Sequence, residues 1–441
     1  MDDLLRLAGY FPKTLYAVGG CVRDGIAGKK PYDVDLAADV SPDDVIACLK
    51  GTEYSVSATS PKLMTLKIRG KRDYEYTAFR TDSYSDRGHE PTEVKRTSEI
   101  ALDALRRDFT MNAVYYDIIG KKYVDPLGGT EDIKNGVVRM TSERTFCEDG
   151  LRLMRLCRQA AETGFSVEEK TMGYAKRNAD GIMEISPERI RDELNRILVA
   201  DLRYGNAGGQ TKGIELLEET GVLKIILPEL TAGIGMEQRK DYHKYDVFGH
   251  ILQTVRVAPP SIRLAALMHD IAKPYCKVEY GRYAGHDVEG ERIARDVLTG
   301  LRYSNAVVKE TCFLVRNHMY NLKNDVSDKK LRVFIQKNYR YIDKLVALKK
   351  ADYEGGGVLE GECPSALRIE RLYKEMKEEG VPFTLSELKI NGDDLKRIGL
   401  EGEKIGSVLN ELLVMSASDP KFNDREKLTE YIIKKEKRNA D

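Results

Sequence analysis

Hydrophobic and polar positions divide this chain of 441 residues into two parts. In residues 1 to about 139, short apolar runs alternate with amphipathic segments, which is typical of strands alternating with helices. From about residue 140 onward, nearly every segment has helical periodicity and few strand signals remain. The pattern predicts an α+β fold, in which an N-terminal α/β head with a small mixed sheet precedes an all-helical remainder.

Five apolar runs of the first part are strand candidates, and three segments are helix candidates. The expected strands are Leu15–Val18, Val34–Ala37, Met64–Ile68, Tyr74–Phe79 and Val114–Asp117. The expected helices are Val22–Ala27, Pro42–Leu49 and Ala101–Phe109. A polar, turn-rich connection extends from Arg80 to Leu105, and a connection of this length in a compact domain is usually functional or disordered.

Composition narrows the class of protein. The length suggests roughly three domains or one elongated protein of several parts. Basic and acidic residues number 71 each, so a nucleic-acid partner would need positive charge gathered on one surface. Seven scattered cysteines without a Cys-x-x-Cys pair fit a reducing cytoplasm and argue against a structural zinc site. Since neither a signal-peptide pattern nor a run of 18 apolar residues occurs, we expect a cytoplasmic protein that does not enter the membrane.

The stretch from residue 15 to residue 36 carries the clearest chemical pattern. A short apolar run ends in Gly19 and Gly20, and Arg23 follows three residues later. Glycine lets the backbone approach a bulky anion, and N–H groups at the start of the next helix suit a phosphate. Arg23 would add a planar cation for the same group.

Two acids follow in the next apolar run. Positions i and i+2 of a strand point the same way, so Asp33 and Asp35 would present two carboxylates suited to Mg²⁺. Glu75, on a neighbouring predicted strand, could complete the site or be an ordinary strand carboxylate. Alone, the glycines could form a turn and the acids a solvated loop. Together they indicate nucleotidyl transfer by two metal ions.

A second informative stretch is Glu148–Arg158. Helical periodicity places Arg152, Arg155 and Arg158 on one sector, opposite an apolar face. On geometry alone, the solvated face of an amphipathic helix is the simpler interpretation. Alternatively, Asp149 and Arg152, one turn apart, could read the hydrogen-bonding edge of a nucleobase, and Arg158 could meet a phosphate.

Two further stretches have plainer interpretations. Arg106 and Arg107, beside Asp108 and Asn112, could bind phosphate or sugar, or could be the solvated end of a helix. Residues 185–194 begin another helix with good N-terminal signals, and a structural role is enough to explain these residues.

Five of the six histidines lie in the helical part. Four of them and two aspartates could converge on one site with nitrogen and oxygen ligands: His250, His269, Asp270, His286, His318 and Asp352. The His269-Asp270 pair resembles the HD motif of metal-dependent phosphohydrolases. The resemblance implies that His250 and Asp352 are its outer ligands, and that His286 and His318 match the two-metal versions. This site could bind a second divalent transition metal, or it could be a scaffold without metal. We expect His243 and His89 to be surface residues.

The ordered motifs together resemble a known family. Gly-Gly-x-Val-Arg-Asp with Asp-x-Asp, Arg-Arg-Asp-Phe-Thr-x-Asn-Ala, Asp-Pro-Leu-Gly-Gly and Glu-Asp-x-x-Arg are similar to motifs of bacterial class II CCA-adding enzymes. A-adding enzymes, CC-adding enzymes and bacterial poly(A) polymerases are their relatives. The motifs cover roughly residues 15 to 200.

The resemblance implies an elongated protein of four parts with tRNA as acceptor and CTP and ATP as substrates. The expected parts are a head at 1–139, a helical neck at 140–200, a body with the HD-type motif at 201–360 and a tail at 361–441. The resemblance also implies Mg²⁺ at Asp33 and Asp35. No obligatory protein partner is inferred.

The same resemblance implies roles for single residues. Gly20 and Arg23, with Gly19, would bind the triphosphate, Arg107 would contact the nucleotide, and Asp149 and Arg152 would pair with the base. Arg155 and Arg158 would continue that site. The chain departs from the family at Cys21, where alanine is usual, and at Gly150, where proline is usual. Gly150 could loosen the start of the base-reading helix.

We therefore expect template-independent addition of CMP and AMP to the 3′ end of tRNA. CC-adding relatives have a shortened loop at the position of Arg80–Leu105, which looks full length here. An A-adding enzyme with a separate CC-adding partner stays open. So does an HD phosphohydrolase as main or additional activity. A silent RNA-binding protein is disfavoured by the intact Asp33 and Asp35.

Overall fold

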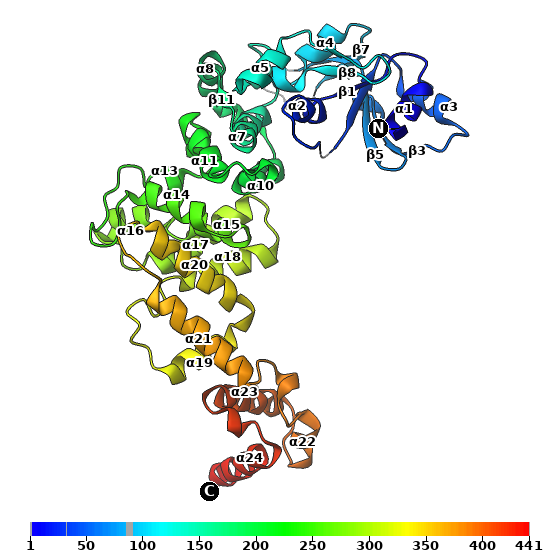
Figure 1. Ribbon diagram of the computed structural model, residues 1–441. Helices are drawn as coiled ribbons and strands as arrows, with labels where there is room; N and C mark the ends of the chain where they lie inside the picture. The colour runs from blue at the N-terminus through cyan, green and yellow to red at the C-terminus, as the bar shows by residue number, and fades with distance from the viewer. Residues whose placement is uncertain (1, 32, 85–90, 441) are drawn as a thin grey trace. The chain divides into compact units, whose positions relative to one another are not determined.

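The computed structural model describes residues 2–31, 33–84 and 91–440. It divides into two compact units, Met1–Thr231 and Ala232–Asp441, coloured from blue to green and from green to red in Figure 1. This boundary falls inside the expected body. The four expected parts stay a prediction.

A mixed sheet of seven strands organises the first unit, as the sequence predicts. Its order is β3-β4-β5-β2-β1-β8-β9, and β2 and β5 are its parallel neighbours. The strands are β1 (Tyr16–Val18), β2 (Asp35–Ala38), β3 (Ser55–Ser60), β4 (Thr65–Arg69), β5 (Asp73–Ala78), β8 (Tyr115–Asp117) and β9 (Lys122–Val124). The short apolar strand β1 lies between β2 and β8, so the segment that follows β1 begins at the end of an interior strand of the sheet.

Short helices accompany the sheet. They are α1 (Asp2–Gly9), α2 (Gly20–Ile26), α3 (Pro42–Leu49), α4 (Ile100–Leu105) and α5 (Gly129–Asn135). Helix α3 has the predicted bounds, because Ser41 accepts a hydrogen bond from the Asp44 backbone and Pro42 occupies the first turn. A cluster of Val18, Ala37, Phe79, Ala104, Ala113 and Tyr115 forms a core beneath β1.

The connection from Arg80 to Leu105 differs from the predicted loop. It contains an antiparallel pair of strands, β6 (Arg80–Ser83) and β7 (Glu93–Arg96), and then α4. Polar strands without an apolar face give no alternating signal, since each is stabilised by its partner strand. Residues 85–90, with His89 and the tip of this connection, lie outside the described residues.

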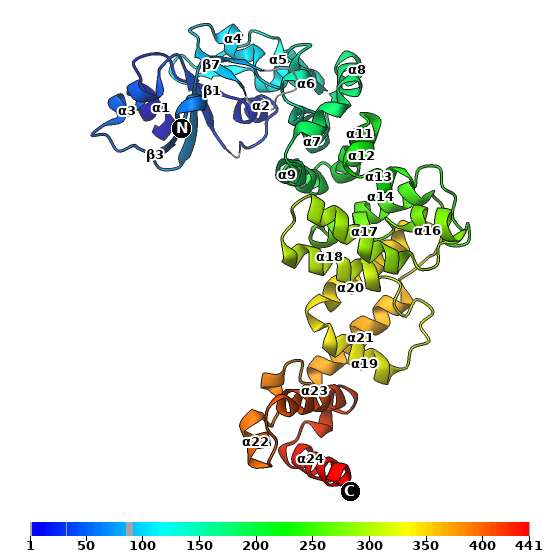
Figure 2. The same ribbon diagram turned by 180° about the vertical axis from the view of Figure 1, so that it is seen from behind.

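The rest of the first unit is helical, apart from a two-residue parallel pair, β10 (Val137–Val138) and β11 (Ser166–Val167). Its helices are α6 (Thr145–Glu148), α7 (Leu151–Thr163), α8 (Glu169–Arg177), α9 (Pro187–Leu198), α10 (Ala200–Tyr204), α11 (Gly209–Glu219), α12 (Val222–Ile226) and α13 (Pro228–Thr231). Helix α7 packs against α9, α10 and α11, which surround it in Figures 1 and 2. Two arginines of its polar sector, Arg152 and Arg158, are therefore buried, and Arg155 is partly buried.

The second unit is built from helices. They are α14 (Val247–Val257), α15 (Arg263–Met268), α16 (Lys273–Tyr280), α17 (His286–Gly300), α18 (Asn305–Asn317), α19 (Asp328–Lys337), α20 (Ile342–Gly355), α21 (Pro364–Glu378), α22 (Gly392–Arg397), α23 (Glu403–Ser418) and α24 (Arg425–Ala440). One core lies among α19, α20 and α21, and another among α22, α23 and α24. Within the described ranges, no helix is long and apolar enough to cross a bilayer.

Candidate active site and metal cluster

The turn at Gly19 touches the first metal-site candidate. Gly19 has a φ of 81°, a left-handed conformation that glycine adopts without strain. A Cβ atom there would lie 3.0 Å from Oδ2 of Asp35. The contact arises because Val18 pairs with Asp35 across the β1–β2 ladder and α2 begins directly afterwards. The predicted glycine turn and carboxylate therefore form one site.

Three carboxylates gather at this turn. Asp35 on β2 and Glu75 on β5 occupy the same register position of parallel strands, while Asp33 precedes β2 and is exposed. Burial raises the pKa of Asp35 above its usual value, and the charges of Glu75 and Asp33 raise it further. Close carboxylates of this kind are stabilised by a bound cation, and oxygen ligands suit Mg²⁺. The residues present therefore fit the expected ion.

A pocket of about 400 Å³ opens beside Asp35. Ten of its lining residues are arginines: Arg23, Arg80, Arg106, Arg107, Arg152, Arg155, Arg158, Arg189, Arg196 and Arg203. Four are aspartates, at positions 35, 82, 108 and 149. A chain with no formal net charge thus gathers positive charge on one surface, as a polyanionic ligand requires.

Asp103 fixes the paired arginines at the rim of this pocket. Its buried carboxylate accepts hydrogen bonds from Arg106 at 2.8 Å, from Arg107 at 3.1 Å and from the Tyr115 hydroxyl. Burial opposes the charge of Asp103, but Arg106 and Arg107 lower its pKa to about 2. The pair is therefore held in place at the pocket, so the solvated helix end is the wrong interpretation.

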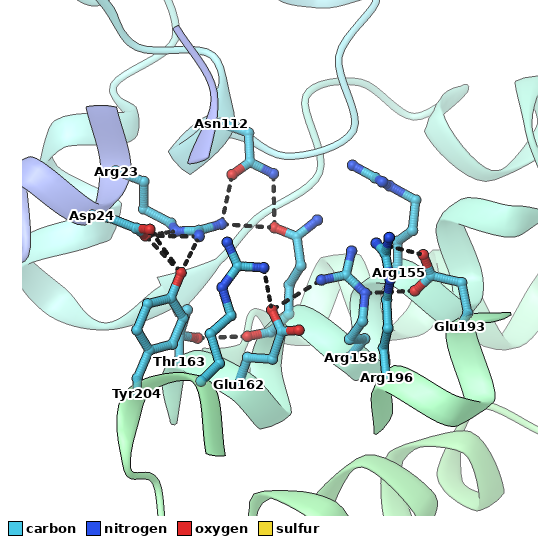
Figure 3. Close-up of polar contacts among 12 residues, drawn as sticks. Arg23, Asp24, Asn112, Arg155, Arg158, Glu162, Thr163, Glu193, Arg196 and Tyr204 are labelled. Atoms are coloured by element: carbon cyan, nitrogen blue, oxygen red, sulfur yellow. Dashed lines mark hydrogen bonds and ion pairs between the residues drawn. The ribbon is translucent and has the colours of Figure 1, made fainter. Parts of the chain in front are cut away.

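A buried network holds Arg23, as Figure 3 shows. Its guanidinium donates to Asp24 at 2.7 Å, to Asn112 at 3.0 Å and to Gln159 at 3.2 Å. It also lies 2.8 Å from the Tyr204 hydroxyl of α10. Arg23 lines the pocket but spends its donors on joining α2 to α7 and α10. Its expected contact with a triphosphate stays a prediction.

Asp108 is the second buried carboxylate of this network. It accepts from Arg155 Nε at 2.9 Å, from Asn112 at 2.9 Å and from Gln159 at 3.0 Å. Although burial opposes its charge, Arg155 holds the pKa of Asp108 well below its usual value. Asp108 therefore aims Arg155 at the pocket, a role that the sequence did not assign.

The expected base-reading pair lies at the start of α7. Asp149 Oδ1 accepts from the Leu151 backbone at 2.9 Å, and its Oδ2 lies 3.6 Å from Arg189. Arg152 is 6% exposed and donates to the Thr145 carbonyl at 3.1 Å and to Glu148 at 3.2 Å. Both line the pocket, so the structure brings them together there.

Gly150, between them, is a point of close backbone contact. A Cβ atom at Gly150 would lie 2.1 Å from the carbonyl oxygen of Gly181. The glycine thus allows the start of α7 to pack tightly, rather than loosening it as the sequence suggested.

Arginines on α9 and α10 are the site residues that the sequence reasoning missed. Arg189 and Arg196 lie on α9 and Arg203 lies on α10, and all three line the pocket. Arg158 of α7 is joined to α9 by an ion pair with Glu193 at 2.6 Å, and it also pairs with Glu162 at 2.9 Å.

The second unit contains a buried cluster with the six expected residues. His250, His269 and Asp270 form one group whose ligand atoms lie within 4.8 Å of one another, and Asp270, His286 and His318 form another. Asp352 joins the first group, with Oδ1 3.0 Å from His250 Nε2. Asp270 is shared, so the cluster has the ligands for two neighbouring ions.

Hydrogen bonds orient three of these imidazoles. His269, His286 and His318 each place Nδ1 within 2.6 to 2.9 Å of a backbone carbonyl three residues earlier. Their Nε2 atoms therefore point inward, the arrangement that outer hydrogen bonds impose on metal ligands. Nε2 atoms lie 3.2 Å apart in His250 and His269, and 3.1 Å apart in His286 and His318.

The centre of the cluster fits a cation. Among the described residues, neither carboxylate oxygen of buried Asp270 has a hydrogen-bond partner of good geometry, although Lys273 Nζ lies 2.6 Å away. His243 was expected at the surface, but its ring is half-buried, 4.5 Å from that of His250. Burial lowers the pKa of His243 to about 4, so it is neutral near pH 7.

Three family models match the chain in sequence. The poly A polymerase head domain matches residues 15–139, and the probable RNA and SrmB-binding site of polymerase A matches residues 164–234. The HD domain matches residues 237–353.

Curated relatives align along most of the chain. The A-adding tRNA nucleotidyltransferase of Deinococcus radiodurans is 30% identical over 432 residues, covering 91% of either protein. The CC-adding tRNA nucleotidyltransferase of Thermus thermophilus is 30% identical over 433 residues, covering 92% of this chain and 91% of that one. A multifunctional CCA protein of Neisseria gonorrhoeae is 33% identical over 301 residues, covering 65% and 69%.

The fold has counterparts among solved structures. The CCA-adding enzyme of Bacillus stearothermophilus in complex with CTP superposes with a TM-score of 0.69 at 20% identity, covering 100% of this chain and 98% of that one. The likeness establishes a common fold.

Proposed function

The chain belongs to the tRNA nucleotidyltransferase family, and we propose that it adds CMP and AMP to the 3′ end of tRNA without a nucleic-acid template. CTP and ATP are the substrates. The observation that carries this proposal is the contact between the Gly19 turn and Asp35, at the mouth of a pocket with ten arginines. A carboxylate beside such a pocket suits a triphosphate and its metal ions.

Asp33, Asp35 and Glu75 would hold Mg²⁺, which when bound helps to deprotonate the RNA 3′-hydroxyl and stabilises the pyrophosphate leaving group. The open backbone at Gly19 and Gly20 gives the triphosphate room beside these carboxylates. Arg107 and Arg155, each braced by a buried aspartate, would orient it. Orientation and fixed positive charge would supply much of the rate.

Asp149 and Arg152 would recognise the base of CTP or ATP in place of a template strand. An acceptor carboxylate and a donor guanidinium offer the two kinds of group that a base edge requires. Both now bond to neighbouring residues, so base binding would exchange those bonds for new ones. Arg158, held by Glu162 and Glu193, would continue the positively charged lining of the same pocket.

The product is the finer part of the proposal. The relatives that align along the whole chain include one A-adding and one CC-adding enzyme, so their similarity favours neither partial product. The present β6–β7 pair favours a connection that is not shortened, which disfavours a CC-adding enzyme and agrees equally with complete CCA addition and with addition of A. Addition of A alone, with a separate CC-adding enzyme, is the alternative.

One experiment separates these products. The protein is incubated with tRNA ending at the discriminator base, after C or after CC, with CTP and ATP supplied separately and together. Extension of the first substrate by three nucleotides supports CCA addition. Extension of only the CC-ending substrate, by one A, identifies an A-adding enzyme.

We further propose a phosphohydrolase activity for the HD domain. The shared Asp270 and the inward Nε2 atoms of the histidines support two divalent transition-metal ions. Hydrolysis of 2′,3′-cyclic or simple phosphoesters should then need added metal and should disappear in His269→Ala. Hydrolysis that survives this change would contradict the assignment.

The free cysteines and the absence of a bilayer-spanning helix in the described ranges agree with a cytoplasmic location, which we also propose.

A further inference from the structure

A second basic hollow lies next to the active pocket. Its lining consists of Lys29, Lys30, Pro31, Arg203 and Tyr204, and its volume is about 650 Å³. Arg203 also lines the active pocket, so the two hollows share a wall. The lining joins two distant segments: the linker after α2, which leads to Asp33, and the end of α10.

Tyr204 organises this hollow. Its hydroxyl lies 2.8 Å from both carboxylate oxygens of buried Asp24 and 2.8 Å from Arg23, contacts that Figure 3 shows. The ring faces the Lys29 ammonium group at 4.4 Å and the Arg203 guanidinium at 5.2 Å. The hydrogen bonds of its hydroxyl thus fix the ring, and two cations lie beside the face of the ring.

The lysines carry uncompensated charge. In the described part of the chain, no carboxylate lies within ion-pair distance of Lys29 or Lys30. Arg203 lies 3.5 Å from Glu162, which faces it from α7. Lys29 and Arg203 lie beside the ring, and Lys30 belongs to the same lining. The nearby acids are Glu162 and Asp24, and Asp24 is paired with Arg23. The hollow is therefore positively charged, as an anion site requires.

We propose that this hollow binds a backbone phosphate of the acceptor RNA, a few nucleotides before its 3′ end. The inference rests on the proposed function and adds a subsite to it. Lys30 is three residues from Asp33, so the two Cα atoms are at most roughly 10 Å apart. At about 3.4 Å of rise per stacked nucleotide, that distance corresponds to the last three or so nucleotides of a strand whose end lies at Asp33 and Asp35.

The triphosphate is the other possible source of a phosphate. It would lie at the Gly19–Gly20 end of α2, whereas Lys29 and Lys30 follow the opposite end of that helix. The seven residues of α2 separate the two ends by about 10 Å. The position therefore favours the RNA strand over the incoming nucleotide.

The test compares a double variant, Lys29→Gln with Lys30→Gln, with a matched control, Lys121→Gln with Lys122→Gln. The control removes two lysines at the β8–β9 hairpin of the same unit, outside the lining of either hollow. Fluorescence titration of labelled tRNA ending in CC gives the dissociation constant at several salt concentrations. Steady-state assays with the same RNA give KM for ATP, and assays with tRNA ending at the discriminator base give KM for CTP.

The double variant should weaken RNA binding about 10-fold and reduce the slope of log Kd against log salt by about 1.4, that is, by two single-strand phosphate contacts. The control should bind RNA like the wild type, and KM for ATP and CTP should stay unchanged in the double variant. RNA affinity within two-fold of wild type would overturn the proposal, since the lysines would then only complement the end of α2. A raised KM for nucleotide with unchanged RNA affinity would overturn it in favour of the triphosphate.

Failure of the proposed function has a different signature. If the wild type added neither CMP nor AMP, nucleotidyl transfer would be refuted while the titration still measured the subsite. The binding experiment does not depend on turnover.

Discussion

Gly19 and Asp35 are in contact: a Cβ atom on Gly19 would lie 3.0 Å from the Asp35 carboxylate oxygen Oδ2. The residue that follows β1 therefore sets the space between the phosphate turn and the metal-site carboxylate. The relationship explains why a glycine pair and an Asp-x-Asp pattern belong to one site. It also makes the turn sensitive to a single methyl group.

Gly19→Ala should lower the activity by far more than its loss of stability can explain. The positive φ, with a ψ of −145°, costs roughly 1–3 kcal/mol for an L-residue, and the new methyl group pushes Asp35 out of place. Displacement of a reacting group on this scale lowers kcat/KM for ATP by about 100-fold. The control is Gly51→Ala, which has the same φ of 81° but no atom within 4 Å of the added Cβ. Equal activity losses in the two variants would contradict the contact.

Gly150→Ala should destabilise the start of α7. Its Cβ would lie 2.1 Å from the Gly181 carbonyl, so two backbone segments must separate, at a cost of about 1–3 kcal/mol. The thermal midpoint should fall, and discrimination between CTP and ATP should weaken because Asp149 and Arg152 flank the glycine. Gly181→Ala is the matched control, since its Cβ meets nothing closer than 3.7 Å. A normal midpoint for Gly150→Ala would refute the tight packing.

Asp103 should contribute stability that depends on pH. Its folded-state pKa of about 2 lies below the ordinary value of 3.8, so its contribution is present above pH 4 and is lost as pH falls towards 2. The shift corresponds to about 2 kcal/mol, or roughly 4–8 °C in a unit of this size. The difference in melting temperature between wild type and Asp103→Asn should therefore shrink on acidification below pH 4. The exposed Asp73→Asn should show little difference at any pH.

The HD cluster should lose its ions separately. Because the two ligand groups share only Asp270, His318→Ala should remove one bound metal ion per chain and leave the other. Asp270→Ala should remove both. Metal content of protein purified with added Mn²⁺ or Zn²⁺, measured by mass spectrometry, gives the counts. An unchanged metal content in Asp270→Ala would contradict the role of Asp270 as the shared ligand, and wild-type protein without bound metal would show that the cluster is a scaffold.

Residues whose roles depend on local sequence could be predicted. The apolar run before Gly19, Asp35 on the next strand, and the capped start of α3 lie where the pattern indicates. Asp33 differs, because β2 begins only at Asp35 and the two acids do not share a strand. The histidine cluster was also predictable, since histidine is rare in this chain and yet recurs on successive helices. In each case the signal lies within a few residues of the feature.

Roles that arise from distant contacts could not be predicted. Asp103 and Asp108 look like ordinary surface acids until folding buries them under arginines from other segments. Arg189 and Arg196 belong to α9, and the capping signals at the start of this helix are explained by a structural role alone. Only the packing of α9 against α7 turns the two arginines towards the pocket. The β6–β7 pair has no apolar face, so each strand is defined by its partner.

The most direct test of the proposed site is nucleotide incorporation by Asp35→Ala. With tRNA ending in CC and labelled ATP, the variant should incorporate no AMP, while its tRNA affinity stays close to that of the wild type and Asp73→Ala behaves normally. Incorporation at a rate near that of the wild type would contradict the account, because the Gly19 turn would then touch a carboxylate that the reaction does not need.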